Sequence, residues 1–186
     1  MPVRKESKVS VVVKQDWDDL TDKTITWLRD RGISEHTAKQ ARIKTAQHYI
    51  ASLKKQTECV VFPYINQTQV YAAKVRAISD KGFSCSGAPA SFFNFDSITE
   101  GEDLYICEGE MDCLSLMEVG FQSVVSVPNG AVMKVVDGKI DPQEDNKFKF
   151  LWDAKDNLDA AKRIIIATDA DGAGEAMAEE IARRIG

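Results

Sequence analysis

The sequence predicts an α/β protein built from two units: an N-terminal α+β unit with a small antiparallel sheet, then a unit with a mainly parallel sheet. A helical hairpin and short β segments fill the first half, whereas strands alternate with helices in the second. The charge also reverses, because residues 1–99 carry 15 Lys and Arg against 10 Asp and Glu, and residues 100–186 carry 9 against 19. We therefore expect a flexible arm at 1–14 and units at 15–100 and 101–186.

The composition is that of a globular chain. Of the 186 residues, 44% are hydrophobic and 28% are charged, as in soluble domains. No apolar run approaches the roughly 20 residues that cross a bilayer, and the charged residues 1–10 lack the apolar centre of a signal peptide. The four cysteines form no Cys-x-x-Cys pair, which argues against zinc in this chain. We expect a cytoplasmic protein without a membrane partner.

Two short helices open the first unit. Apolar residues recur at helical spacing over 20–28, with Asp16 or Asp18 available as the N-cap. Ser34 is the expected cap of a second helix over 35–41. This hairpin carries the basic residues Arg29, Arg31, Lys39, Arg42 and Lys44.

Three extended segments follow the hairpin. Residues 58–64 and 69–76 are rich in β-branched and aromatic residues, with a turn at 66–68 between them. A third segment contains Phe83 and begins after Lys81 and Gly82. The pattern predicts a small antiparallel meander.

The second unit alternates strands with helices, which predicts parallel pairing through right-handed crossovers. The expected strands are 104–107, 123–127 and 163–168, and the expected helices are 110–119, 145–159 and 173–185.

Two acidic clusters follow the first and last of these strands. Glu108, Glu110 and Asp112 come after one, and Asp169 and Asp171 come after the other. The carboxyl ends of parallel strands meet at one edge of the sheet, where such folds bind ligands. Clustered carboxylates repel one another unless a cation neutralises them, and oxygen ligands favour Mg²⁺, Mn²⁺ or Ca²⁺ over Zn²⁺. The sequence therefore predicts a divalent-metal site that handles phosphates.

Other interpretations of these clusters fit less well. Glu110 and Asp112 could simply be charges that suit a helix N-terminus. A dinucleotide-binding loop needs a third glycine where Met177 stands. An EF-hand loop beginning at Asp169 would have Ala173 at a ligand position and a strand in place of the entering helix. A purely structural turn would have to explain two clusters in the same strand context.

The motifs Glu108-Gly109-Glu110-x-Asp112 and Asp169-x-Asp171-Gly172-x-Gly174 together resemble the Toprim domain of primases, topoisomerases, certain nucleases and repair proteins. The resemblance covers roughly residues 103–186 and implies a Rossmann-like, mainly parallel sheet. Toprim domains commonly continue with a further strand and a later acidic position, so the resemblance implies a shortened domain.

Shorter motifs, most of them in the first half, indicate which Toprim proteins the chain resembles. Lys74-Val75-Arg76, the aromatic segment near Phe83 and the sequence SVPNGA at 126–131 resemble the primase part of phage primase-helicases and Twinkle-like proteins. This implies a DNA primase catalytic core that synthesises short RNA primers on single-stranded DNA by metal-dependent nucleotidyl transfer. The setting would be a bacterial or phage-infected cell.

The resemblance also implies residue roles. Glu108, Asp169 and Asp171 would be catalytic and would bind Mg²⁺ or Mn²⁺, with Glu108 as a ligand or general acid/base. Glu110 and Asp112 would support them. Nucleotide or nucleic-acid contacts would come from Lys74, Arg76, Lys81, Asn129 and Gly130.

Two alternatives stay open: a Toprim nuclease or phosphodiesterase, and a catalytically incomplete fragment that binds nucleic acid through its basic hairpin. For a primase, the implied partners are a single-stranded DNA template and ribonucleoside triphosphates. Zinc-binding and helicase domains or subunits would lie outside this chain, because it shows neither a zinc-ligand pattern nor a P-loop.

Overall fold

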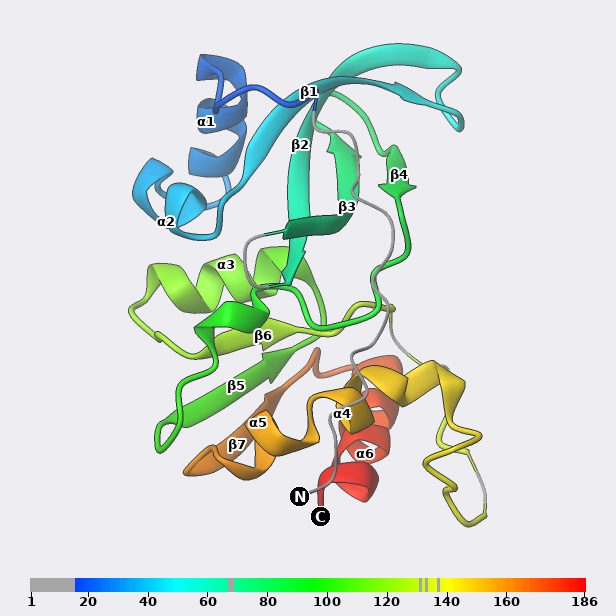
Figure 1. The fold of residues 1–186 in the computed structure, drawn as a ribbon. Coiled ribbons are helices and arrows are strands. Elements are labelled where there is room, and N and C mark those ends of the chain that lie inside the picture. The colour runs from blue at the N-terminus through cyan, green and yellow to red at the C-terminus, as the bar shows by residue number, and fades with distance from the viewer. Residues whose placement is uncertain (1–15, 67–68, 131, 133, 137) are drawn as a thin grey trace.

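A computed structural model describes residues 16–66, 69–130, 132, 134–136 and 138–186. It contains a four-stranded antiparallel sheet and a three-stranded parallel sheet, with one helix, α3, lying between them (Figure 1). The predicted arm at 1–14, most of the turn at 66–68 and Ala131 lie outside the described residues. The predicted fold class is confirmed.

The helical hairpin forms as predicted, with a different first cap. Helix α1 (Asp22–Arg29) is capped by Thr21, whose side chain accepts a hydrogen bond from the Thr24 N–H. The expected cap at Asp16 or Asp18 is wrong, because Asp18 instead pairs with Thr45 as an isolated β-bridge. Helix α2 (Glu35–Gln40) begins after Ser34, whose side chain caps it as predicted.

The antiparallel sheet has the order β1-β2-β3-β4. Strands β2 (Lys55–Asn66), β3 (Gln69–Ala77) and β4 (Phe83–Ser86) match the predicted meander. Strand β1 (Lys44–Ile50) was not predicted, because its residues lack an apolar alternation. It is held by antiparallel pairing with β2, from Lys44 opposite Val61 to Ile50 opposite Lys55.

The second sheet is parallel, with the order β6-β5-β7, as expected for the alternating pattern. Its strands are β5 (Asp103–Cys107), β6 (Val124–Ser126) and β7 (Arg163–Ala167). Helix α3 (Glu110–Glu118) packs on one face, and helices α4 (Lys149–Asp153), α5 (Lys155–Asp159) and α6 (Gly172–Ile185) pack on the other. The single helix predicted at 145–159 is instead a 3₁₀ turn and two short helices, because Ala154 leaves the helical region (φ −94°, ψ 3°).

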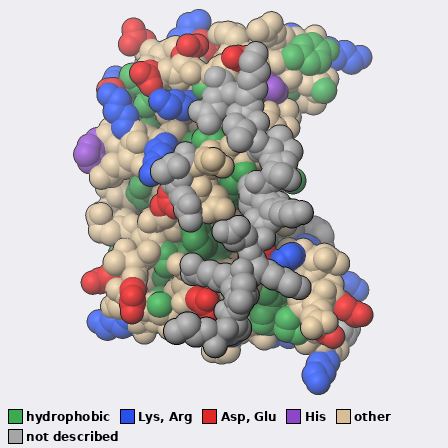
Figure 2. All heavy atoms as spheres, in the orientation of Figure 1, with side chains coloured by type: hydrophobic (Ala, Val, Ile, Leu, Met, Phe, Trp, Pro, Cys, Tyr) green, Lys and Arg blue, Asp and Glu red, His purple; other side chains and the backbone are tan. Residues whose placement is uncertain are grey.

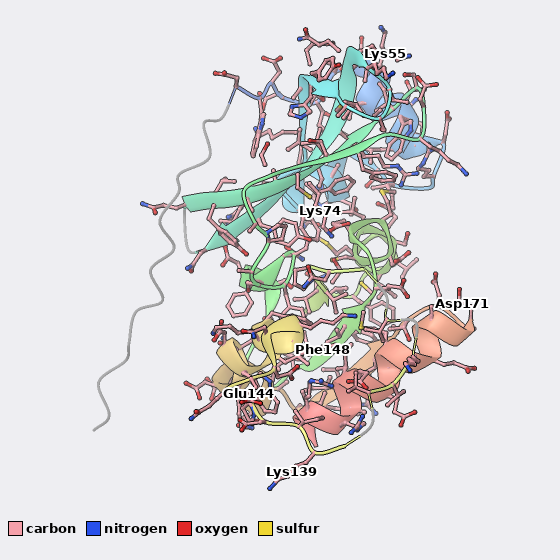
Figure 3. All side chains as sticks on the ribbon, turned by 90° about the vertical axis from the view of Figure 1, so that its right-hand side faces the viewer. Lys55, Lys74, Lys139, Glu144, Phe148 and Asp171 are labelled. Atoms are coloured by element: carbon pink, nitrogen blue, oxygen red, sulfur yellow. The ribbon has the colours of Figure 1, made fainter. Side chains whose placement is uncertain are left out.

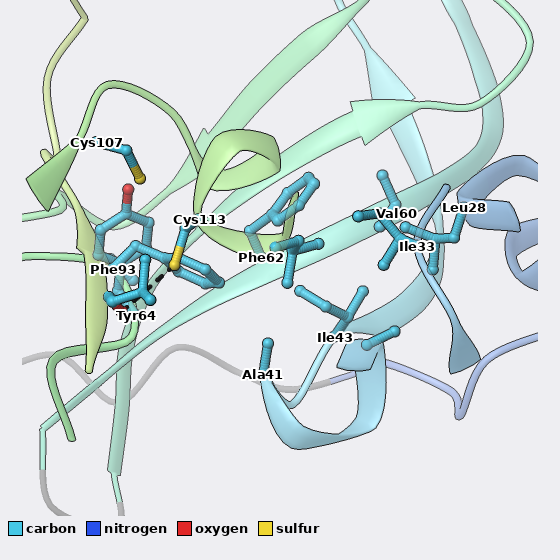
Figure 4. Close-up of a cluster of buried hydrophobic side chains, with 14 of the residues drawn as sticks. Leu28, Ile33, Ala41, Ile43, Val60, Phe62, Tyr64, Phe93, Cys107 and Cys113 are labelled. Atoms are coloured by element: carbon cyan, nitrogen blue, oxygen red, sulfur yellow. Dashed lines mark hydrogen bonds between the residues drawn. The ribbon is translucent and has the colours of Figure 1, made fainter. Parts of the chain in front are cut away.

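One hydrophobic core joins the two units. Leu28 of the hairpin, Phe62 of β2 and Leu114 of α3 belong to the same buried cluster (Figure 4). Phe93, in the segment between the sheets, contacts Phe62 edge-on with ring centroids 6.1 Å apart. The boundary near residue 100 thus separates the sheets along the chain, while their packing holds the antiparallel sheet against α3.

Two further features concern membrane-spanning helices and cysteine thiols. In the part of the chain that the structure describes, no helix is long and apolar enough to cross a membrane. Cys59, Cys107 and Cys113 are buried free thiols, and Cys85 is an exposed one.

Candidate active site

The loops that follow the three parallel strands leave the same edge of the sheet. Cys107, the last residue of β5, is level with Ser126 of β6 and Ala167 of β7. The residues that come next are Glu108, the exposed pair Asn129 and Gly130, and the exposed pair Asp169 and Asp171. The fold therefore brings five of the predicted site residues to one edge.

Glu108 is the least solvated of these acids. Its Oε2 atom is buried and has no hydrogen-bond partner among the described residues. Partial burial of the carboxylate raises the pKa of Glu108, and repulsion from Asp169 and Asp171 raises it further. The three carboxylates therefore interact, and a cation would relieve both the repulsion and the unpaired oxygen. An all-oxygen donor set with this charge fits Mg²⁺ or Mn²⁺.

Asp171 has a second role that the sequence analysis missed. It is the N-cap of α6, and its Oδ1 atom accepts hydrogen bonds from the N–H groups of Ala173 (3.0 Å) and Gly174 (2.8 Å). An aspartate directly before a helical pattern is the ordinary signal for such a cap. Among the described residues, no three acidic, Cys or His side chains surround a common point. The acids thus lie near one another at the sheet edge, but their side chains do not surround a common point.

Gly174 fixes the backbone of the loop that carries Asp169. A Cβ atom at position 174 would lie 2.0 Å from the Asp169 carbonyl oxygen, well inside contact distance. The Thr168 hydroxyl also donates a hydrogen bond to the Gly174 carbonyl at 2.9 Å. The start of α6 and the end of β7 therefore pack together only because residue 174 lacks a side chain.

Replacing Gly174 with Ala should displace Asp169 and lower the free energy of unfolding by about 1–3 kcal/mol, the usual cost of overpacking. Urea unfolding would measure the change. Gly172→Ala is the matched control, because a Cβ there meets nothing within 4 Å, and its stability should stay close to that of the unmodified protein. Equal stability of the two variants would contradict the close packing of Gly174 on Asp169.

Asp112 and Glu110 begin α3, but they make different contacts. Asp112 accepts a hydrogen bond from the Gly109 N–H at 2.9 Å, as a helix-capping carboxylate does. Glu110 instead reaches the antiparallel sheet, where its Oε1 atom lies 2.5 Å from Lys74 Nζ and 2.5 Å from the Tyr64 hydroxyl. Burial and the nearby Glu110 carboxylate raise the pKa of Tyr64, so its hydroxyl remains the donor. Glu110 is therefore the link between the two units at the site.

Lys74 and Arg76 share one face of β3, as predicted, but their side chains contact different parts of the molecule. Lys74 lies between the antiparallel sheet and α3, while Asp171 lies at the start of α6 (Figure 3). The Arg76 guanidinium points to the hairpin side, 5.2 Å from the Trp27 ring and 5.3 Å from the Phe83 ring. Lys81 is exposed in the turn between β3 and β4. Of the predicted cations, the structure thus places Lys74 next to residues 108–112, which follow β5 and include the start of α3; we call these residues the acidic loop.

The comparisons with known proteins agree with this geometry. Residues 102–186 match the family model of the Toprim domain, which confirms the resemblance that the two acidic motifs predicted. The whole chain is 36% identical to a Twinkle homolog protein (chloroplastic/mitochondrial) of Arabidopsis thaliana and spans 25% of it. It is 33% identical to a primase homolog protein of the same plant and spans 53% of that protein.

A solved structure shares the fold of both units. The primase fragment of the bacteriophage T7 primase-helicase protein superposes with a TM-score of 0.68 at 24% identity, over 95% of this chain and 69% of that one. The resemblance to primase-helicases and Twinkle-like proteins is confirmed. The chain corresponds to a quarter and to about half of the two plant relatives' lengths.

Proposed function

We propose that this chain is the catalytic core of a DNA primase, which joins ribonucleotides into short RNA primers on a single-stranded DNA template. The contact of Lys74 with Glu110 carries the proposal, because it couples the antiparallel sheet to the acidic loop of the Toprim domain. An acidic loop alone would suit any Toprim enzyme. The first unit, aligned along its length with proteins named Twinkle homolog and primase homolog, favours primer synthesis.

Each of these residues would have its own role in nucleotidyl transfer. Glu108, Asp169 and Asp171 would hold Mg²⁺ or Mn²⁺, which would lower the pKa of the attacking 3′-hydroxyl and offset charge on the phosphoryl group. Asp171 is held in place by its cap on α6. Lys74 neutralises Glu110 at the start of α3, and its ammonium group would contact a phosphate of the nucleotide.

The remaining roles belong to the same proposal. Asp112 supports the start of α3, while Arg76, Lys81, Asn129 and Gly130 would contact nucleotide or template. Ribonucleoside triphosphates and single-stranded DNA would be the substrates, and zinc-binding and helicase domains or subunits would lie outside this chain. The expected cytoplasmic location in a bacterial or phage-infected cell stays a prediction, since one plant relative is named as chloroplastic/mitochondrial.

Primer synthesis tests the proposal directly. The protein would be incubated with a pool of single-stranded DNA templates, labelled ribonucleoside triphosphates and Mg²⁺ or Mn²⁺, with zinc-binding and helicase partners added in a parallel reaction. We expect short RNA products that disappear in Asp169→Asn and persist in Asp80→Asn, an exposed aspartate paired with Lys55. Metal-dependent shortening of the DNA without RNA products would instead indicate a nuclease. Template binding without products in both reactions would indicate an incomplete fragment.

A further inference from the structure

Two arginines and two aromatic rings alternate in a row on the first unit. The Arg31 guanidinium lies 3.7 Å from the centroid of the Trp27 ring. The Arg76 guanidinium lies 5.2 Å from the centroid of the Trp27 ring and 5.3 Å from that of the Phe83 ring. We call Arg31, Trp27, Arg76 and Phe83 the arginine–aromatic row.

The outer end of this row is open to solvent. Phe83 is 64% exposed, whereas Trp27 is 8% exposed. Single exposed hydrophobic residues are common and usually need no explanation. Phe83 differs because a guanidinium lies close to its ring, so the side chain has a fixed charged neighbour and still offers aromatic surface to a ligand.

Among the described residues, the two arginines of the row have no acidic partner, and Arg31 donates a hydrogen bond to the Trp27 carbonyl oxygen. Many other cations of the first unit form ion pairs, and blue and red side chains are interleaved beside α1 and α2 in Figure 2. The paired cations are Lys23, Lys39, Arg42, Lys44 and Lys55. In the described part of the chain, neither Arg31 nor Arg76 makes an ion pair. Burial lowers the pKa of Arg76, and repulsion from Arg31 lowers it further, so an anion bound between them would be favourable.

The row shares strand β3 with Lys74, the cation that contacts Glu110 at the start of α3. Arg76 and Lys74 are two residues apart on β3, which corresponds to about 7 Å along the strand, and they lie on one face. Lys74 contacts Glu110, two residues beyond Glu108. Phe83 is opposite Arg76 in the β3–β4 ladder. A strand of nucleic acid lying on Phe83 and Arg76 would therefore be directed toward the carboxylates.

We propose that Phe83 is a stacking surface for a base of the single-stranded DNA template, and that Arg76 and Arg31 bind the phosphates beside that base. The inference rests on the proposed function and adds a template contact to it. Alternating aromatic and cationic side chains are how proteins bind single strands without reading their sequence, because every base has a face that can stack. An apolar face of a protein partner would cover Phe83 but would leave the two guanidinium groups without an anion.

Binding of a labelled oligodeoxynucleotide, followed by fluorescence anisotropy, tests the stacking contact. Phe83→Leu keeps an apolar side chain and removes the ring, so it should weaken binding about 5- to 150-fold, and Phe83→Trp should retain the affinity. Tyr49→Leu is the matched control, because Tyr49 is 59% exposed on β1, the opposite edge strand of the same sheet. It should bind like the unmodified protein.

Abasic DNA and a salt titration distinguish the stacking contact from the phosphate contacts. On an oligonucleotide whose bases are replaced by abasic sites, the difference between Phe83→Leu and the unmodified protein should disappear. Arg76→Gln should lower the slope of log affinity against log salt by about 0.7, the value for one phosphate on a single strand, and Phe83→Leu should leave this slope unchanged. Thermal unfolding of each variant would establish that it is folded.

The outcomes distinguish this inference from the function on which it rests. If the protein makes primers but Phe83→Leu binds DNA as tightly as the unmodified protein, the stacking contact is wrong and the primase proposal stands. If Phe83→Leu loses affinity only on DNA with bases while no primer is made, the stacking contact stands and the primase proposal fails. Equal loss in Phe83→Leu and Tyr49→Leu would overturn the inference.

Discussion

Replacing Glu108 with Gln is expected to abolish metal-dependent primer synthesis and, at the same time, to make the metal-free protein more stable. Glutamine keeps the shape of glutamate and removes its charge. Loss of a neighbouring group that merely orients a ligand already costs about 10- to 100-fold in metal affinity or activity. Loss of a ligand itself should therefore reduce primer synthesis by at least about 100-fold.

The gain in stability follows from the raised pKa of Glu108. Its proton is held more tightly in the folded state, so ionisation of Glu108 opposes folding. This destabilisation is absent below the ordinary pKa of a glutamate, develops as the pH rises toward the raised value, and is complete above it. Glu108→Gln should therefore unfold at a higher temperature than the unmodified protein at pH 8 in EDTA, and the difference should vanish near pH 4.

Thermal unfolding with and without metal measures both effects. Mg²⁺ or Mn²⁺ should raise the unfolding temperature of the unmodified protein, because the metal binds only the folded state, and should barely affect Glu108→Gln. Glu118→Gln is the matched control with the opposite sign. Hydrogen bonds from Thr37 and Ser34 lower the pKa of Glu118, so removing its charge should lower stability at pH 8. A Glu108→Gln variant that is less stable in EDTA, or that retains the response to metal, would contradict a metal site at Glu108.

Local patterns were enough to predict the acidic edge of the site. The strands that end at Cys107 and Ala167 are short apolar runs; Glu108 follows the first directly, and Asp169 follows the second after one residue. Parallel pairing then brings the two strand ends together without any further information. This is why Glu108, Asp169 and Asp171 were predicted together, although they are separated by about 60 residues in the sequence.

Contacts between the two units could not be predicted in this way. Tyr64 lies in β2 and Glu110 lies in α3, 46 residues further along the chain. No rule of sequence spacing predicts their contact. The close approach of Gly174 to the Asp169 backbone is equally hidden, because a glycine in a turn pattern does not show which atoms lie near it. Strand β1 was missed for a related reason, since its pairing with β2 replaces the missing apolar alternation.

The largest effect on stability is expected at the other end of α6, in a buried ionic network. Arg184 donates to Asp145 Oδ2 at 2.6 Å and also pairs with Glu180, which is fully buried. Glu180 Oε1 accepts a hydrogen bond from the Val136 N–H at 2.5 Å, and the Arg184 guanidinium lies 3.8 Å from the Phe148 ring centroid. Through Val136 and Asp145, the network therefore connects the segment between β6 and α4 to the last turns of α6.

Replacing Arg184 with Met should lower the free energy of unfolding by about 3–5 kcal/mol, because the buried Glu180 and Asp145 lose the guanidinium they share and Glu180 keeps only its pair with the more exposed Arg183. Arg163→Met is the matched control, since Arg163 pairs with Asp103 at an exposed position, and such pairs contribute about 1 kcal/mol or less. Urea unfolding at pH 7 measures both. Adding Glu180→Gln to Arg184→Met removes the buried charge that Arg184 no longer balances and should restore part of the loss.

The dependence on pH gives an independent check of the same network. Burial alone would raise the pKa values of Asp145 and Glu180, but Arg184 and their other hydrogen-bond donors outweigh burial and lower both. Their contribution to stability is therefore present above the ordinary carboxyl pKa values and is lost as the pH falls toward the lowered ones. The unmodified protein should lose more stability than Arg184→Met between pH 6 and pH 3, so the two unfolding curves should converge in acid. A constant difference across that range would mean that Arg184 stabilises the fold by packing on Phe148 and not by pairing with the two carboxylates.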